Sequence, residues 1–225
     1  MDVKDFLNKL DIKYDNLDLY VTAFTHSSYS NEKGNCKNYE RLEFLGDAVL
    51  QYYVSKYIFD LYRDIPEGSL TTLRSKLVRE ESLARFAREL NIPPFIRLGY
   101  GEEHTGGRKR DSIQADIFEA FIGALSEDDK IDDVLRILNM TIYKHVDDVD
   151  YEDITDYKTT LQEVIQSDNR KTVEYEIISS TGPSNNPEFI AAVKMDEIVL
   201  GTGKGGSKKK AQQQAAKDAL DKMAK

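Results

Sequence analysis

Four acidic residues fall in two segments that are otherwise mostly apolar. Glu43 and Asp47 lie in the segment YERLEFLGDAVL, and Asp116 and Glu119 lie in QADIFEAFIGAL. At about 100° per residue, each pair occupies one stripe of a helix whose opposite face is apolar. Because burying an unpaired carboxylate is costly, we expect a cation to compensate these acids. Carboxylate oxygens suit Mg²⁺, which can activate water for hydrolysis.

The elements that would position these acids are predicted to be helices throughout residues 1–146. Apolar residues recur at helical spacing in six segments, near residues 2–10, 16–25, 38–61, 66–90, 112–126 and 131–146. The glycine-rich stretch GYGEEHTGGRKR is expected to be a loop, and Ser112 is a candidate N-cap for the helix that follows it. Gly46 and Gly123 would allow close helix contact near the acids.

The chain changes character after residue 146. Residues 147–156 are rich in acids and poor in apolar residues, which is typical of a linker. Beyond them, TVEYEIIS, PEFIAAVK and EIVLGT predict three strands between two helices. The predicted fold is therefore multi-domain: an all-α domain over 1–146, a linker, and an α-β-β-β-α (α+β) domain over 157–225.

Composition restricts the cellular setting. The net charge is −9 and the only cysteine is Cys36, so no intrachain disulfide can form, which suits a reducing compartment. No run of eighteen apolar residues and no secretory signal pattern is present. We therefore expect a cytoplasmic protein without membrane attachment.

The motifs in the first 146 residues resemble the catalytic domain of ribonuclease III. They are FTHSSY, NYERLEFLGDAV, EGSLTTLRSKLV and ADIFEAFIGA, in the order found in that family. The segment from DYKTTLQE through GPSNNPEF to GTGKGGSKKKAQQQAA resembles a double-stranded RNA-binding domain. Together the two resemblances cover nearly the whole chain.

The resemblance implies an Mg²⁺-dependent, homodimeric endoribonuclease that cuts double-stranded RNA, with Mn²⁺ expected to substitute. It assigns Glu43, Asp47, Asp116 and Glu119 to the metal site, and we expect Asp47 and Glu119 also to orient the attacking water. Products would carry 5′-phosphate ends with short 3′ overhangs, in RNA processing and decay. Removing Glu119 should lower the rate far more than RNA affinity.

Three further residues of the first domain have two interpretations each. Glu40 and Glu67 match acids of the family, but both could equally lie on a solvated helix face, and Glu67 follows Pro66 at a helix start. Phe44 lies beside the acids and off the apolar face, so it belongs either under a neighbouring helix or in a dimer interface.

The second domain offers three expected contacts to duplex RNA. They are Gln162 and Glu163 on the first helix, Asn185 in the loop GPSNNPEF, and Lys208, Lys209 and Lys210 at the start of the last helix, where the dipole favours phosphate. A solvated charge run is the alternative for the lysines. Gly201, Gly203 and Gly206 match a dinucleotide-binding pattern, but too little chain follows for a βαβ unit, so no nucleotide cofactor is expected.

The sequence thus predicts a ribonuclease III-type enzyme. The main alternative is a dimeric double-stranded RNA-binding protein without catalytic activity. A structural protein whose acidic helices bind another protein is a second alternative, which the lysine-bearing tail disfavours.

Overall fold

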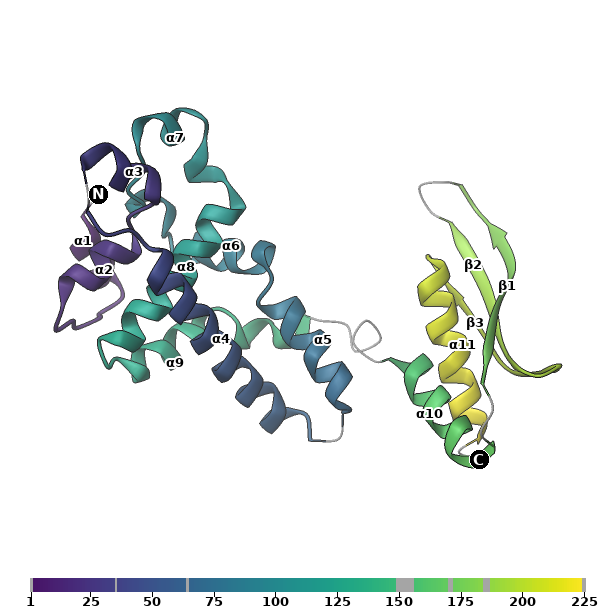
Figure 1. The fold of residues 1–225 in the computed structure, drawn as a ribbon. Helices are drawn as coiled ribbons and strands as arrows, with labels where there is room; N and C mark the ends of the chain where they lie inside the picture. Colours follow the sequence, from purple (N-terminus) through teal and green to yellow (C-terminus); the bar gives the residue numbers. More distant parts are fainter. Residues whose placement is uncertain are drawn as a thin grey trace. The chain divides into compact units, whose positions relative to one another are not determined.

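A computed structural model of the chain describes residues 2–34, 36–63, 65–148, 156–169, 172–183 and 187–223. The chain divides into two compact units, Met1–Ile154 and Thr155–Lys225, each with its own hydrophobic core. The first unit is helical, and the second combines a sheet with two helices (Figure 1). The predicted fold class is confirmed. Most of the predicted linker, residues 147–156, lies outside the described residues.

The first unit is built from α-helices joined by short connections and 3-10 turns. The helices are α1 (Val3–Lys9), α2 (Leu17–Ala23), α3 (Ser27–Lys33), α4 (Glu40–Leu61), α5 (Glu67–Leu77), α6 (Glu80–Glu89), α7 (Tyr100–His104), α8 (Asp111–Glu127) and α9 (Ile131–Met140). The 3-10 turns are η1 (Pro93–Phe95), η2 (Gly107–Lys109) and η3 (Tyr143–Asp148).

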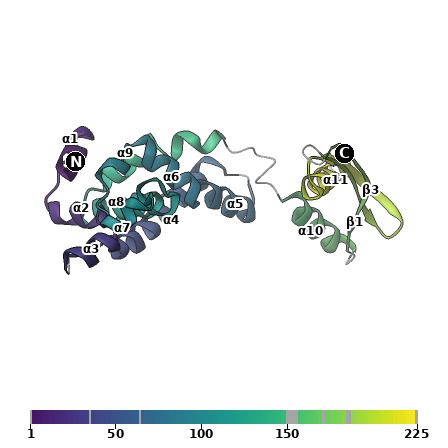
Figure 2. The same cartoon turned by 90° about the horizontal axis from the view of Figure 1, so that it is seen from above.

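Helix α8 forms the centre of this unit (Figure 2). Its residues from Ile113 to Leu125 are buried apart from the two acids, and it packs against α2, α4, α6 and α9. A helix that is apolar on most sides must be covered by its neighbours. Phe121 of α8 joins an aromatic cluster around Phe6, with ring centroids 5.3 Å apart. The central position of α8 therefore fixes the acids that it carries.

Four local predictions differ from the structure. The predicted helix over 131–146 ends at Met140 and is followed by the separate 3-10 turn η3. The predicted helix over 66–90 is two helices, α5 and α6, because the backbone becomes extended at Arg79. A short helix, α7, interrupts the predicted loop GYGEEHTGGRKR. The predicted N-cap Ser112 lies inside α8, which begins at Asp111 after Arg110.

The second unit is a three-stranded antiparallel sheet with two helices on one face. Its elements are α10 (Tyr157–Asn169), β1 (Glu174–Thr181), β2 (Glu188–Met195), β3 (Ile198–Gly205) and α11 (Lys208–Met223). The strand order is β1-β2-β3, and the tight turn between β2 and β3 places Asp196 at φ 54°. Buried residues on α10, β2 and α11 form the core, including Leu161, Val193 and Ala215.

The glycines of β3 allow α11 to pack directly on the sheet. A Cβ on Gly201 would lie 2.4 Å from the main-chain oxygen of Ala215, and one on Gly203 would lie 2.2 Å from the nitrogen of the same residue. Ala211 and Ala215 supply the matching small side chains of α11, and both are fully buried. Close packing, not nucleotide binding, accounts for these two glycines of the pattern.

Candidate active site

Helix α4 carries two of the predicted metal ligands in its first two turns. Glu43 is half-buried and Asp47 is exposed, while Leu42 and Leu50 face the core. The amide nitrogens of Leu42 and Glu43 donate to the main-chain oxygen of Tyr39, which anchors the start of the helix. Acidic residues near a helix N-terminus interact favourably with the helix dipole. The start of α4 therefore tolerates this negative charge.

Helix α8 carries the other two ligands on its less buried stripe. Asp116 and Glu119 are half-buried, whereas Ile117 and Phe118 between them are completely buried. The one-turn spacing places both acids on the same side of the helix.

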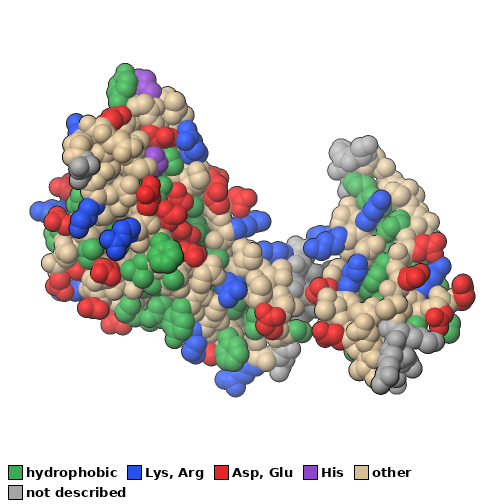
Figure 3. All heavy atoms as spheres, viewed as in Figure 1, with side chains coloured by type: hydrophobic (Ala, Val, Ile, Leu, Met, Phe, Trp, Pro, Cys, Tyr) green, Lys and Arg blue, Asp and Glu red, His purple; other side chains and the backbone are tan. Residues whose placement is uncertain are grey.

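Two glycines bring these helices into main-chain contact. A Cβ on Gly46 would lie 1.8 Å from the main-chain oxygen of Glu119, and one on Gly123 would lie 2.1 Å from that of Leu42. The predicted role of both glycines in close helix contact is confirmed. Because Gly46 lies between Glu43 and Asp47, this contact sets the two pairs of acids beside each other. Figure 3 shows acidic side chains gathered on this unit beside a group of hydrophobic ones.

The four acids act on one another electrostatically. Burial, followed by the charges of Asp116, Glu40 and Asp47, raises the pKa of Glu43 to about 7. Burial, followed by the charges of Asp47, Glu43 and Asp116, raises the pKa of Glu119 to about 8. Burial is the larger cause of both shifts, and the like charges of the neighbouring carboxylates add to it. Each of the four acids is therefore within electrostatic reach of at least one of the others.

Two hydrogen bonds orient the acids. The hydroxyl of Tyr39 donates to Oδ2 of Asp116 at 2.8 Å, and Nε2 of Gln51 donates to Oδ1 of Asp47 at 3.2 Å. Burial raises the pKa of Asp116, while the hydrogen bond from Tyr39 and the nearby His26 oppose this rise. The sequence reasoning missed both donors. Gln51 could have been found from its position one helical turn after Asp47, whereas the contact between Tyr39 and Asp116 joins distant parts of the chain.

The donor set of the site suits a hard divalent cation. Within the described ranges, no group of three or more His, Cys, Asp or Glu side chains is already arranged to hold a metal ion. The chemistry of the four acids nevertheless fits, because they offer only oxygen ligands. After burial, the neighbouring carboxylates help to raise the pKa values of Glu43 and Glu119, and a cation would relieve this repulsion.

The structure separates the two auxiliary acids. Glu40 is exposed and close enough to contribute to the raised pKa of Glu43. Glu67 lies at the start of α5, where its carboxylate accepts a hydrogen bond from Thr71 at 2.9 Å. It is not among the charges that raise the pKa of Glu43 or Glu119. Of the two, only Glu40 belongs to the acidic cluster, by which we mean Glu40 together with Glu43, Asp47, Asp116 and Glu119.

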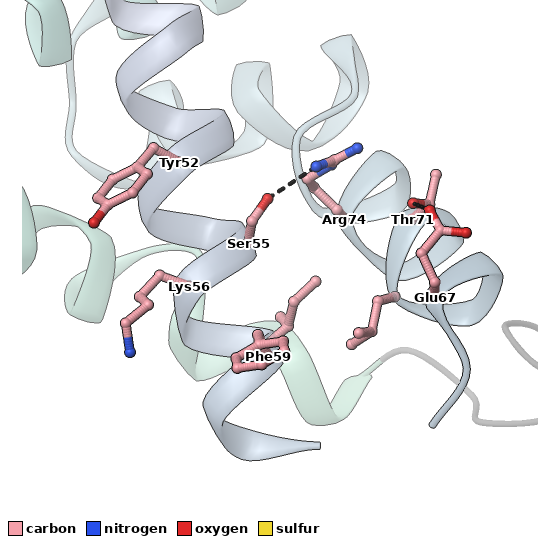
Figure 4. A pocket seen from close by; sticks show the side chains of 9 residues that line it. Tyr52, Ser55, Lys56, Phe59, Glu67, Thr71 and Arg74 are labelled. Atoms are coloured by element: carbon pink, nitrogen blue, oxygen red, sulfur yellow. Dashed lines mark hydrogen bonds between the residues drawn. The ribbon is translucent and has the colours of Figure 1, made fainter. Parts of the chain in front are cut away.

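Phe44 projects from α4 into solvent with 81% of its surface exposed, so it is not covered by a neighbouring helix of this chain. Further along α4, Tyr52 and Phe59 are 62% and 65% exposed. They line a groove of about 340 Å³ between α4 and α5, where Arg74 donates a hydrogen bond to Ser55 (Figure 4). Exposed aromatic residues thus continue along α4 from the acids to this groove.

The predicted RNA contacts in the second unit are placed as follows. Gln162 is half-buried, and its side-chain oxygen accepts a hydrogen bond from the amide of Val173 at 3.2 Å, while Glu163 is exposed. Asn185 lies outside the described residues. Exposed side chains at the first turn of α11 are Lys208, Lys209 and Lys210.

Two family models match the chain in the same order as the two units. Residues 16–146 match the model described as ribonuclease-III-like, and residues 157–223 match the double-stranded RNA binding motif. The chain belongs to the ribonuclease III family. With the four acids brought together and an RNA-binding module following them, it is an endoribonuclease that acts on double-stranded RNA. The predicted activity is confirmed and favoured over the non-catalytic alternative.

Relatives within the ribonuclease III family align over nearly the whole chain. Ribonuclease 3 of Bacillus cytotoxicus is 48% identical over 97% of this chain and 90% of its own length. Ribonuclease 3 of Streptococcus equi subsp. zooepidemicus is 48% identical over 96% of this chain and 95% of its own. A structure of the nuclease domain of ribonuclease III from Campylobacter jejuni is 36% identical, with a TM-score of 0.59, over 64% of this chain and 97% of that domain.

Among the described residues of this family member, no helix is both long and apolar enough to cross a membrane.

Proposed function

We propose that this enzyme binds Mg²⁺ through Glu43, Asp47, Asp116 and Glu119, and hydrolyses duplex RNA to products with 5′-phosphate ends and short 3′ overhangs. The observation that supports this is the electrostatic coupling of acids from two helices whose main chains touch at Gly46 and Gly123. A divalent cation bound there supplies an activated water and neutralises charge on the phosphate, and Mn²⁺ offers similar oxygen coordination.

The acids divide the remaining work. Glu43 and Asp116, on facing helices, bind the cation, and the hydroxyl of Tyr39 donates a hydrogen bond to Asp116. Asp47 and Glu119 orient the attacking water. Burial and the neighbouring carboxylates raise the pKa of Glu119 in the cation-free site, and a bound cation would favour its deprotonated form, which can accept a hydrogen bond from that water. Glu40 adds negative charge beside Glu43, and we assign no catalytic step to Glu67.

Cleavage of long duplex RNA by the full chain tests this function. We expect fragments with 5′-phosphate ends in Mg²⁺ or Mn²⁺ and none in EDTA. The variant E119Q should lose at least a hundred-fold in cleavage rate while its duplex affinity, measured by gel shift, stays within about two-fold. Full activity in EDTA, or in a variant lacking all four acids, would overturn the proposal. Duplex binding without any cleavage would favour the non-catalytic alternative.

We assign RNA binding to residues 157–225, joined by the linker 147–156 to the catalytic domain of residues 1–146. Three exposed lysines at the start of α11 support a contact with RNA phosphates by charge, and the exposed carboxylate of Glu163 is of a type that can accept a hydrogen bond from a 2′-hydroxyl. The side-chain amide of Gln162 is of a type that can donate to a 2′-hydroxyl, and its oxygen is held by the amide of Val173. Asn185, which falls between β1 and β2 in the sequence, completes the proposed set.

We further propose that the enzyme is a homodimer whose interface includes Phe44. An aromatic side chain with 81% of its surface in water is typical of an interface, and the exposed Tyr52 and Phe59 extend the same apolar surface. The related nuclease domain from Campylobacter jejuni has structural flexibility in a region involved in its dimer formation. A two-fold enzyme also suits a substrate with two antiparallel strands. The cytoplasm, where RNA is processed and degraded, is the proposed location.

A further inference from the structure

Tyr39 connects three segments of the catalytic unit at the edge of the acidic cluster. Only 6% of its surface is exposed. Its amide nitrogen donates to the main-chain oxygen of Thr25 at 2.9 Å, and its own main-chain oxygen accepts the first hydrogen bonds of α4. Its hydroxyl reaches across to Asp116 of α8 at 2.8 Å. The position of Tyr39 is therefore fixed independently of the carboxylate that it contacts.

The ring of Tyr39 is held as firmly as its backbone. The imidazole of His26 lies against it, with ring centroids 5.6 Å apart. His26 is itself held by a contact between its Nδ1 and the Ser28 hydroxyl at 2.8 Å. A buried ring with a fixed backbone leaves the hydroxyl little freedom to follow the carboxylate, so the carboxylate must follow the hydroxyl.

A neutral hydroxyl is a suitable partner for a metal-binding carboxylate. It engages one oxygen of Asp116, Oδ2, and the other oxygen is the one that a cation can share. Unlike a lysine or arginine, a phenol brings no positive charge that would compete with the cation. Hydrogen bonds of this kind behind a metal ligand orient it and tune its affinity.

We propose that Tyr39 is a positioning residue of the hydrolytic site, whose hydroxyl holds the Asp116 carboxylate in the orientation that binds the divalent cation. This inference rests on the proposed function of the four acids. The residue touches neither RNA nor the reacting water; it acts through Asp116.

The chain contains a matched control for this contact. The hydroxyl of Tyr20, which is fully buried, donates to Oδ2 of Asp128 at 3.0 Å. Asp128 caps the C-terminal end of α8, the helix that also carries Asp116. The amides of Asp15 and Asn16 donate to the same carboxylate, so this pair ties the fold together and lies outside the acidic cluster. The two contacts pair the same residue types on one helix, but only one adjoins the site.

The test compares Y39F with Y20F in the full-length protein. Each substitution removes one hydroxyl and leaves the ring in place. We measure Mn²⁺ affinity by calorimetry without RNA, the Mg²⁺ concentration for half-maximal cleavage, and the KM for duplex RNA at saturating Mg²⁺. For Y39F we expect the Mn²⁺ dissociation constant and the Mg²⁺ concentration for half-maximal cleavage each to rise about ten-fold or more. The KM for duplex RNA should stay unchanged, and high Mg²⁺ should restore most of the cleavage rate. Y20F should lower the unfolding temperature without changing the Mn²⁺ dissociation constant or the Mg²⁺ concentration for half-maximal cleavage.

A double-mutant comparison decides whether Tyr39 acts through Asp116. In a D116N background, adding Y39F should change Mn²⁺ affinity no further. Wild-type Mn²⁺ affinity in Y39F would overturn the inference while leaving the proposed function intact. Loss of cooperative unfolding in Y39F would also count against it, because the hydroxyl would then serve the fold. If the wild-type enzyme needs no divalent cation, both the inference and the proposed function fail.

Discussion

Gly46 of α4 lies directly against the main chain of Glu119 in α8, so closely that a Cβ at position 46 would stand 1.8 Å from the Glu119 carbonyl oxygen. Carbon and oxygen atoms that are not bonded to each other cannot approach this closely, so any side chain at position 46 must push the helices apart. Because each helix carries two of the four acids, the same contact determines both the packing of the unit and the geometry of its site.

We predict that Gly46→Ala destabilises the protein and impairs catalysis together. Overpacking at a backbone contact costs about 1–3 kcal/mol or more, and separating the helices weakens cation binding by all four acids. Urea unfolding and a Mg²⁺ titration of cleavage measure the two effects.

Gly68→Ala is the control for this substitution. Gly68 lies in the first turn of α5, and a Cβ there would meet nothing within 4 Å. Alanine in an open helical position should be neutral or stabilising by about 0.5–1 kcal/mol. If G46A were as stable and active as G68A, the close contact would not be required.

The protonation of Glu119 gives the stability of the cation-free protein a defined pH dependence. Burial and nearby carboxylates raise the pKa of Glu119 from 4.5 to about 8, so the folded state holds a proton that the unfolded chain has released. The stability that this proton contributes is complete below pH 4.5 and is lost as the pH rises through 8. Glu43, with its pKa raised to about 7, contributes in the same direction.

We therefore predict that E119Q is more stable than wild type at pH 8 in EDTA, by on the order of 2 kcal/mol. The stability difference between E119Q and wild type should shrink towards pH 5. There the carboxyl of wild-type Glu119 is protonated in the folded state and in a growing fraction of unfolded chains. Unfolding free energies measured in urea from pH 5 to 8.5 give this curve, with the exposed Glu67→Gln as the control. Equal pH profiles for E119Q and wild type would show that Glu119 does not carry the raised pKa.

Local patterns in the sequence were sufficient to predict the acids and the helices that carry them. Glu43 and Asp47 stand out because the period of the apolar residues in α4 leaves them on one stripe, and the same holds for Asp116 and Glu119 in α8. The strands of the second unit were predicted from β-branched runs bounded by turns. Such signals lie within a dozen neighbouring residues.

The features that the sequence did not disclose depend on tertiary contacts. The contact between Tyr39 and Asp116 joins residues 77 positions apart, and no local pattern encodes it. The break between α5 and α6 contains no proline or glycine that would mark it in the sequence. The chain leaves the helical conformation at Val78 and Arg79 through their backbone angles alone. Helix α7 forms within a glycine-rich stretch, where Arg108 and Arg110 pair with Glu103 and Glu102 to hold the segment.

The exposure of Phe44 predicts that its removal affects association and not folding. In Phe44→Ala we expect dimer dissociation constants at least about thirty-fold higher, as for a central interface residue, and cleavage that falls at low protein concentration. The unfolding free energy of the monomer should change little, because this side chain packs against little of its own chain. Analytical ultracentrifugation measures the dissociation constant, and Tyr100→Ala, another exposed aromatic, is the control. A monomeric wild-type protein, or a fully dimeric F44A, would contradict this assignment.

The lysines at the start of α11 should contribute to RNA binding through phosphate contacts. If Lys208 and Lys209 each neutralise a phosphate, the double variant K208A/K209A loses counterion release on binding. We expect weaker affinity for duplexes of any sequence, and a slope of log affinity against log salt that is smaller by about 1 for each lysine. Lys222, which pairs with Asp218 near the other end of the same helix, supplies the control K222A. Fluorescence anisotropy with a labelled duplex across a salt series separates the cases, since a solvated charge run would leave the slope of K208A/K209A equal to that of K222A.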